Sequence, residues 1–212
     1  MSDFHSDPAT LAVARERPLL IVDADEVLLA FVAGFDRFLR ERALFLDLVS
    51  YRLHGNVKRL EDRSPLIDIE VTALLDEFRS DLDSLDAVEH AREVLASLAR
   101  DMAIVVLTNI APVQAPARRR NLDILGFAYP LVVNNGPKGR AVKSLASRAG
   151  KPVFFVDDIP QHLSAAAQEA PDVWRIQLIG DERLKPLMPK APDAQLRAET
   201  WHDAETFIRE HL

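Results

Sequence analysis

The sequence predicts an α/β protein, with a three-layer α/β/α Rossmann-like core built on a parallel sheet. Five short runs are almost continuous in apolar residues and lack in-and-out alternation, which is typical of parallel strands covered on both faces. Segments with helical spacing of apolar residues separate these runs, as in right-handed βαβ units. The 212 residues, 48% of them hydrophobic, suffice for one core domain with a small appendage.

The predicted elements follow one another in a regular order. The strands are expected at residues 18–22, 103–107, 130–133, 152–156 and 174–179. The helices between and after them are expected at 87–98, 113–125, 140–149, 161–169 and 204–211. Gly150 is placed to end the third of these helices. Residues 185–192 contain three prolines and are expected to be irregular.

One interval is too long for a simple crossover connection. Asp23 and Ala103 lie 80 positions apart, far more than one helix needs. Within it, residues 29–46 and 65–79 have helical patterns and residues 51–63 are polar. We therefore expect a small helical cap at 29–85, inserted after the first strand. The core is expected at 17–28 and 86–212, behind a loose leader at 1–16.

Composition and charge exclude several classes of protein. No apolar run reaches the roughly 18 residues that a membrane span requires, so no membrane partner is expected. The chain has no cysteine, and its polar first residues do not resemble a signal peptide, so we expect a cytoplasmic protein. The net charge is −7, and the one basic run, 118–120, is too short to follow a nucleic-acid polymer. The oligomeric state, monomer or homodimer, stays open.

Polar side chains gather where the predicted strands end. These are Asp23 and Asp25 in "IVDADEV", Thr108 and Asn109 in "VVLTN", Lys138 in "NNGPKGR", and Asp157 and Asp158 in "VFFVDD". Each motif alone has an ordinary explanation as a turn or a helix cap. Because the carboxyl ends of parallel strands meet at one edge of a sheet, we expect these side chains to lie together.

Such a cluster has a chemical interpretation. Carboxylates that repel one another are tolerated when they bind a hard cation, and Mg²⁺ prefers carboxylate, water and phosphate oxygens. An acidic protein that handles a phosphate also needs a cation to offset the repulsion. A carboxylate can attack phosphorus to form an aspartyl-phosphate, and a hydroxyl, backbone amides and a lysine can hold the phosphoryl oxygens. The pattern therefore favours phosphoryl-transfer chemistry.

This ordered set resembles the four motifs of the haloacid dehalogenase (HAD) superfamily of phosphohydrolases, over residues 19–179. Receiver domains carry similar residues, but their acidic pair comes first and their lysine last. The resemblance implies a HAD-type fold and a Mg²⁺-dependent phosphatase that hydrolyses a small phosphorylated metabolite, a phosphomonoester, through an aspartyl-phosphate. A phosphomutase or phosphotransferase with the same nucleophile, or a non-catalytic phosphate- or partner-binding relative, are the alternatives.

The resemblance also implies a role for each motif residue. Asp23 would be the nucleophile, and Asp25 would be the general acid and then the general base. Thr108, with the backbone of Asn109, would bind the phosphoryl oxygens, and Lys138 would neutralise charge on Asp23 and the phosphoryl group. Dehalogenases of the superfamily lack an acid at the position of Asp25, so phosphate esters are favoured.

The implied metal site comprises Asp23, the backbone carbonyl of Asp25, and Asp158. Asp157 would be a further ligand or lie beside the site, and which of the two neighbouring acids binds directly stays open. Lys138 is preferred as the motif lysine because of its Gly-Pro-Lys-Gly loop, with Lys143 or Lys151 as alternatives.

Other positions bear on the pocket. Glu26 stands where most superfamily members have glycine, and it is expected to alter the loop or the pocket. Residues 23–41 also resemble the opening of the 5'(3')-deoxyribonucleotidases, which implies a mononucleotide substrate. The candidate pocket residues in the cap are Phe31, Phe35, Tyr51, His54, Lys58 and Arg59. Core packing is nevertheless favoured for the two phenylalanines, a solvated loop for 51–59, and a solvent-facing position for His162.

Overall fold

The computed structural model describes residues 4–12, 15–80 and 82–212, and a six-stranded sheet forms its centre. The strands are β1 (Leu19–Val22), β4 (Ala103–Asn109), β5 (Leu131–Asn134), β6 (Val153–Asp157), β7 (Trp174–Leu178) and β8 (Leu196–Ala198). Their order in the sheet is β5-β4-β1-β6-β7-β8, and neighbouring strands pair in parallel. The predicted parallel sheet is confirmed. The edge strand β8 was not predicted, because three residues are too few to show a pattern.

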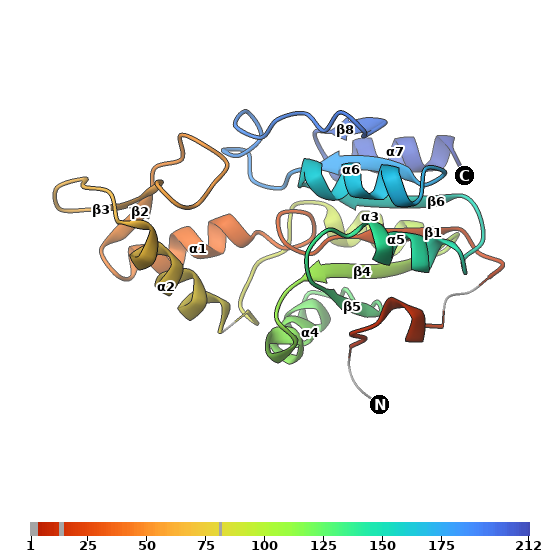
Figure 1. The fold of residues 1–212 in the computed structure, drawn as a ribbon, viewed down its shortest axis with the longest axis horizontal. Coiled ribbons are helices and arrows are strands. Elements are labelled where there is room, and N and C mark those ends of the chain that lie inside the picture. Colours follow the sequence, from red (N-terminus) through yellow and green to blue (C-terminus); the bar gives the residue numbers. More distant parts are fainter. Residues whose placement is uncertain (1–3, 13–14, 81) are drawn as a thin grey trace.

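Helices cover both faces of this sheet (Figure 1). They are α3 (Ala91–Leu98), α4 (Ala115–Ile124), α5 (Gly139–Ala146), α6 (Pro160–Glu169) and α7 (Trp201–Glu210). Leu20 and Val22 of β1 belong to the buried cluster that contains side chains of α3, α4 and α7. Leu19 and Ile21 belong to the cluster that contains side chains of α5 and α6. The three-layer α/β/α arrangement is confirmed, and burial on both faces explains why β1 is apolar throughout.

Some helix ends differ from the predicted ones because the backbone sets them. His90 adopts a left-handed conformation with φ 62°, so α3 begins at Ala91 and not at 87. A short 3₁₀ helix, η2 (Pro112–Gln114), precedes α4. The helix α5 ends at Ala146, so Gly150 is not its stop. A Cβ at Gly150 would lie 2.6 Å from the carbonyl oxygen of Arg17. Glycine is needed at this position because the two backbone segments approach each other closely.

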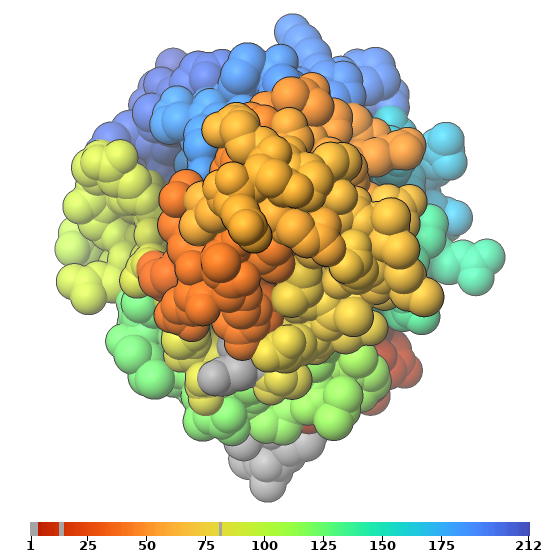
Figure 2. Space-filling model, turned by 90° about the vertical axis from the view of Figure 1, so that its left-hand side faces the viewer, coloured from red at the N-terminus to blue at the C-terminus, as the bar shows by residue number. Residues whose placement is uncertain are grey.

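A second unit projects beyond the carboxyl ends of the strands (Figure 1). It consists of α1 (Phe31–Arg40), β2 (Leu44–Leu46), β3 (Val57–Arg59) and α2 (Asp68–Arg79), and β2 and β3 pair antiparallel. In the view of Figure 2 this segment, orange to yellow, spreads across the face of the molecule. Helices α1 and α2 lie within the predicted helical segments 29–46 and 65–79, whereas β2 replaces the end of the first segment and β3 lies within the polar stretch 51–63.

This second unit shares its core with the rest of the chain. One cluster of buried side chains includes Phe35 and Phe78 of the inserted helices together with Leu20 and Val22 of β1. The division into a cap at 29–85 and a core therefore stays a prediction about organisation. Among the described helices, none is both long and apolar enough to cross a membrane.

The segment before β1 is attached to the core where it is described. His5 forms a parallel bridge with Val132, and a 3₁₀ helix, η1 (Pro8–Thr10), follows it. The Arg148 guanidinium donates hydrogen bonds to the carbonyls of Pro8, Ala9 and Leu11. Residues 5–11 thus contact the core, whereas the expected leader at 1–16 stays a prediction about domain organisation, and residues 1–3 and 13–14 lie outside the described part.

Trp201 connects α7 to the loop after β1, and this contact can be tested. Its side chain is buried, and Nε1 donates to the Val27 carbonyl at 2.9 Å. Trp201→Phe removes the donor from a buried carbonyl, so we expect the free energy of unfolding to fall by about 1–3 kcal/mol in urea titrations. Trp174→Phe, at a half-buried position, is the matched control. An equal effect of the two substitutions would contradict the role of the Trp201 hydrogen bond.

Candidate active site

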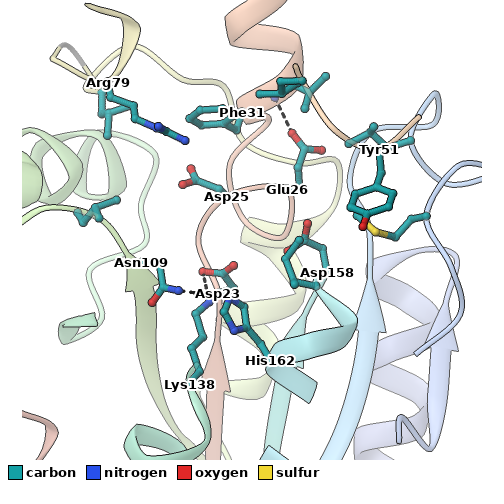
Figure 3. Close-up of a pocket in the computed structure, with 17 residues that line it drawn as sticks. Asp23, Asp25, Glu26, Phe31, Tyr51, Arg79, Asn109, Lys138, Asp158 and His162 are labelled. Atoms are coloured by element: carbon teal, nitrogen blue, oxygen red, sulfur yellow. Dashed lines mark hydrogen bonds and ion pairs between the residues drawn. The ribbon is translucent and has the colours of Figure 1, made fainter. Parts of the chain in front are cut away.

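A buried ion-paired cluster lies at the carboxyl ends of β1 and β6. Val22 of β1 pairs with Val156 of β6, so Asp23, which follows β1, and Asp157, which ends β6, lie at the ends of adjacent strands. Lys138 Nζ is 2.6 Å from Asp23 Oδ1 and 2.7 Å from Asp157 Oδ2. All three side chains are buried, and Figure 3 shows Lys138 reaching Asp23 from below. The lysine thus holds two carboxylates that would otherwise repel each other.

The two acids after β6 differ in their partners. Asp157 accepts the Ile159 N–H at Oδ1, 2.9 Å, and Lys138 at Oδ2, so both of its oxygens are engaged. Asp158 is buried and lines the pocket, and no hydrogen bond or ion pair of its carboxylate is found within the described residues. Asp158 therefore retains free oxygens.

These carboxylates fit a divalent cation. Asp23, Asp157 and Asp158 each offer an oxygen, and the three atoms lie within 4.8 Å of one another. Three buried carboxylates face one ammonium group, so the cluster carries an excess of negative charge when all are ionised. An all-oxygen set of this kind suits a hard ion such as Mg²⁺.

Burial dominates the electrostatics of the cluster. It raises the pKa of Asp23 to about 6, although Lys138 acts in the opposite direction. Burial, Asp157 and Asp23 together raise the pKa of Asp158 well above its ordinary value. Burial acts to lower the pKa of Lys138, but the two neighbouring carboxylates outweigh it and raise that pKa, so the lysine stays charged. A cation bound beside these acids would favour their ionised forms.

Asp25 lies above this cluster and has a partner of its own. Its Oδ1 is 2.6 Å from Nη2 of Arg118, a fully buried residue of α4. The Asp25 side chain remains 30% exposed and lines the pocket. Figure 3 places it between Asp23 and Phe31. The two acids of the first motif therefore have separate environments, one paired with a lysine and the other with an arginine.

Thr108 and Asn109 end β4 beside the cluster. Thr108 is buried, and its Oγ1 has no hydrogen-bond partner in the described part of the chain. A buried hydroxyl without a partner is rare and is suited to bind a ligand oxygen. Asn109 lines the pocket and donates from Nδ2 to the Gly136 carbonyl, 2.9 Å, which ties β4 to the loop of Lys138.

Asp23, Asp25, Asn109, Lys138 and Asp158 line a cavity of about 250 Å³, whereas Thr108 and Asp157 are not among the described residues that line it. Its walls from the inserted unit and the following loop are Phe31, Val32, Tyr51, Leu53, Arg79 and Leu82, and those from the sheet side include Ile110, Ile159, His162, Leu184 and Met188. The cavity is thus acidic at its base and mostly apolar at its walls.

Comparison with known proteins identifies the fold. No model of a known protein family matches the sequence, and no curated protein matches it. Among solved structures, a conserved haloacid dehalogenase-like protein of Agrobacterium tumefaciens is similar with a TM-score of 0.62 and 15% identity, over 92% of this chain and 98% of that one. The chain has the haloacid dehalogenase-like fold.

Two further HAD-like structures contain bound groups. A HAD family hydrolase of Deinococcus radiodurans, with bound phosphate and sodium, has a TM-score of 0.59 and 18% identity, over 93% of this chain and 97% of that one. The HAD-hydrolase YfnB of Bacillus subtilis, bound to magnesium, has a TM-score of 0.59 and 13% identity, over 92% and 99%. The resemblance that the motifs indicate is confirmed at the level of the fold.

The structure distinguishes the three lysines considered for the HAD-like motif. Lys138 alone among them lies in the described acidic cluster. Lys143 is on the outer face of α5, 3.2 Å from Glu169, and Lys151 is 3.0 Å from Asp172. Both of these ion pairs lie at the surface, so neither lysine reaches Asp23.

Glu26 lies where the loop after β1 meets helix α1 and the loop after β7. It adopts a left-handed conformation with φ 59°, which costs energy for a residue other than glycine. Its buried carboxylate accepts the N–H of Val32 in α1 at 2.6 Å and the N–H of Asp181 at 3.0 Å. The Glu26 carbonyl accepts the Gly180 N–H at 2.6 Å. A Cβ at position 180 would lie only 2.8 Å from that carbonyl oxygen, so this close approach requires glycine. Burial raises the pKa of Glu26 to about 7. The glutamate therefore links the loop after β1 to α1 and to the loop after β7.

The candidate pocket residues of the inserted unit divide into two groups. Phe31 and Tyr51 line the cavity, so the expected core role of Phe31 is incomplete. The other four have partners elsewhere: Phe35 packs on Phe78, His54 contacts Thr72, Lys58 pairs with Asp47, and Arg59 pairs with Glu70.

His162 corrects the expectation that it faces solvent. It is half-buried in the wall of the cavity, where burial and the nearby Lys138 lower its pKa to about 4. Sequence reasoning also missed Arg79 and Arg118. A signal existed for Arg118, since it lies between Ala115 and Leu122 on the buried stripe of α4, where a charged residue is unusual.

Lys138 can be tested as the counter-charge of the cluster. Lys138→Met leaves Asp23 and Asp157 buried without their cation, so we expect the free energy of unfolding to fall by about 3–5 kcal/mol. Lys143→Met removes an exposed ion pair and should change it by less than about 1 kcal/mol. Urea titrations in EDTA measure both. A Lys138→Met protein as stable as Lys143→Met would contradict the assignment.

Proposed function

We propose that the protein is a Mg²⁺-dependent phosphatase that hydrolyses a small phosphomonoester through an aspartyl-phosphate on Asp23. The observation that carries the proposal is the cluster itself. The Asp23 carboxylate is ion-paired with Lys138 and opens onto a cavity that also contains Asp25 and the free carboxylate of Asp158. The bound phosphate and magnesium of two HAD-like neighbours support the same chemistry.

The proposed reaction has two steps. A carboxylate oxygen of Asp23 bonds to phosphorus while the bond to the leaving oxygen breaks, and Asp25 gives its proton to that oxygen. Asp25 then takes a proton from water as the water oxygen attacks phosphorus, and the Asp23 carboxylate is released with inorganic phosphate. Lys138, the Thr108 hydroxyl and the Asn109 backbone N–H bind the phosphoryl oxygens.

Asp158, Asp23 and the backbone carbonyl of Asp25 would hold Mg²⁺. We assign Asp157 chiefly to Lys138, because both of its carboxylate oxygens already have partners. When bound, the ion supplies positive charge that offsets the repulsion between the carboxylates and the phosphate. The acidic base of the pocket needs such a charge before an anionic substrate can enter.

The pocket suggests a substrate class to test first. Phe31 and Tyr51 offer aromatic surface for a base, and Arg79 lies at the rim with its guanidinium 5.9 Å from the Phe31 ring centroid. A mononucleotide combines an aromatic group with a phosphate and is therefore our leading substrate. We further propose that the protein acts on such metabolites in the cytoplasm, as a monomer or homodimer.

A phosphoester panel with Mg²⁺ tests the function. We expect turnover of at least one mononucleotide or sugar phosphate, and we expect Asp23→Asn to reduce kcat/KM by at least about 1,000-fold because the nucleophile is lost. Asp172→Asn, an exposed acid, is the control. Turnover by Asp23→Asn equal to that of the wild type would refute the proposal. Transfer to an added sugar in preference to water would assign the phosphotransferase alternative.

Metal dependence has two readouts. We expect EDTA to abolish activity and Mg²⁺ to restore it, whereas Ca²⁺ should not, because in-line transfer requires compact octahedral coordination. Without substrate, Mg²⁺ at about 100 times its Kd should stabilise the folded wild type by about 2.7 kcal/mol. Asp158→Asn should weaken this stabilisation. Full activity in Ca²⁺, or the same Mg²⁺ stabilisation in Asp158→Asn, would contradict the proposed site.

A further inference from the structure

Three consecutive arginines of α4 have three different environments. Arg120 forms an ion pair with Asp83, 2.9 Å, and its side chain is more than half exposed. Arg119 donates to the carbonyls of Tyr129 and Phe127, which follow the helix. Arg118 points inward and is fully buried. The three arginines therefore do not form one basic surface, and Arg118 lies in the interior beside the pocket.

The partners of Arg118 are unusually few for a buried guanidinium. Its Nη2 lies 2.6 Å from Asp25 Oδ1, and this ion pair does not have hydrogen-bond geometry. Its Nε and Nη1 have no hydrogen-bond partner within the described residues. Burying a cation costs several kcal/mol unless its charge is compensated. Asp25 provides the one carboxylate with which Arg118 forms an ion pair in the described structure.

One carboxylate oxygen of Asp25 is buried, while the side chain as a whole remains partly exposed to the pocket. Its backbone forms a bridge with Leu29, which fixes the loop. Its Oδ1 is buried against Arg118, whereas the side chain as a whole stays 30% exposed and lines the pocket. Glu26, the next acid, does not compete for Arg118, because its carboxylate accepts two backbone N–H groups elsewhere.

We infer that Arg118 is a positioning residue that fixes Asp25 Oδ1 and thereby directs Oδ2 to the leaving group. The inference rests on the proposed function. Arg118 covers the buried Oδ1, so Oδ2 is the carboxylate oxygen left for proton transfer. The proton on Oδ2 is transferred to the oxygen of the breaking P–O bond and leaves with the product, and in the second step Oδ2 takes a new proton from the attacking water.

If Arg118 positions Asp25, its loss should affect the transfer rate in a way that depends on the leaving group, which a purely structural role would not cause. An alkyl phosphate needs a proton on its leaving oxygen, because an alkoxide is a poor leaving group. The p-nitrophenolate ion leaves without that proton. Disturbing the position of Asp25 should therefore slow transfer from an alkyl phosphate more than transfer from p-nitrophenyl phosphate.

The test compares single-turnover release of the leaving group from these two substrates. The variants are Arg118→Lys, Arg118→Met, Asp25→Asn and the double variant Arg118→Lys/Asp25→Asn, with Arg120→Met as the matched control on the same helix. In the Arg118 variants we expect the alkyl phosphate rate to fall about 10- to 100-fold more than the p-nitrophenyl phosphate rate. The double variant should match Asp25→Asn, since the two residues act together. Arg120→Met should leave the ratio of the two rates unchanged.

The ratio of the two rates does not depend on the folded fraction, so a partly unfolded variant still reports it. Equal losses on both substrates would overturn the inference, and so would effects of Arg118→Lys and Asp25→Asn that multiply in the double variant. Complete loss of both activities in Arg118→Lys would also overturn it and assign Arg118 to folding. Wild-type protein inactive on every phosphoester would instead refute the proposed function.

Discussion

The ion pairs of Lys138 with Asp23 and Asp157 are the interaction on which the rest of the site depends. The end of a parallel sheet places both carboxylates side by side, and a buried lysine between them offsets their repulsion. Lys138 forms ion pairs with both of these acids, whereas the Asp158 carboxylate has no such partner within the described residues. The excess of negative charge makes the cluster costly without a cation and suits it to bind one.

The loop between β1 and α1 is held by the start of α1 and by two distant parts of the chain. Glu26 bonds to the start of α1 and to the loop after β7, and Trp201 of α7 bonds to the carbonyl of Val27. These contacts fix the backbone between the two acids and the inserted unit. Glutamate at a left-handed position, where most members of the superfamily that the motifs resemble have glycine, is thus explained by two hydrogen bonds that its carboxylate accepts from backbone N–H groups. A site whose groups must be placed accurately is consistent with such a rigid loop.

Charge distribution separates the two acids of the first motif. Asp23 faces an ammonium group at the base of the cavity, and Asp25 faces a guanidinium in its wall. The ammonium is a compact charge that can also approach a phosphoryl oxygen, whereas the buried guanidinium forms an ion pair with one carboxylate oxygen only. The proposed division of labour, one acid to attack and one to move a proton, follows from these different partners.

The sequence by itself determined the parallel sheet and the set of acids at its edge. Buried strands such as β1 are continuously apolar, and Asp23 and Asp158 follow their strands within two residues, so this information is local. The short strands β2, β3 and β8 escaped prediction because three residues show no period. Only the tertiary structure decided that Lys138 reaches Asp23, that His162 lines the pocket, and that Arg118 meets Asp25. The two ion pairs join residues 93 and 115 positions apart, and nothing in a local pattern specifies which distant side chain will fill a buried site.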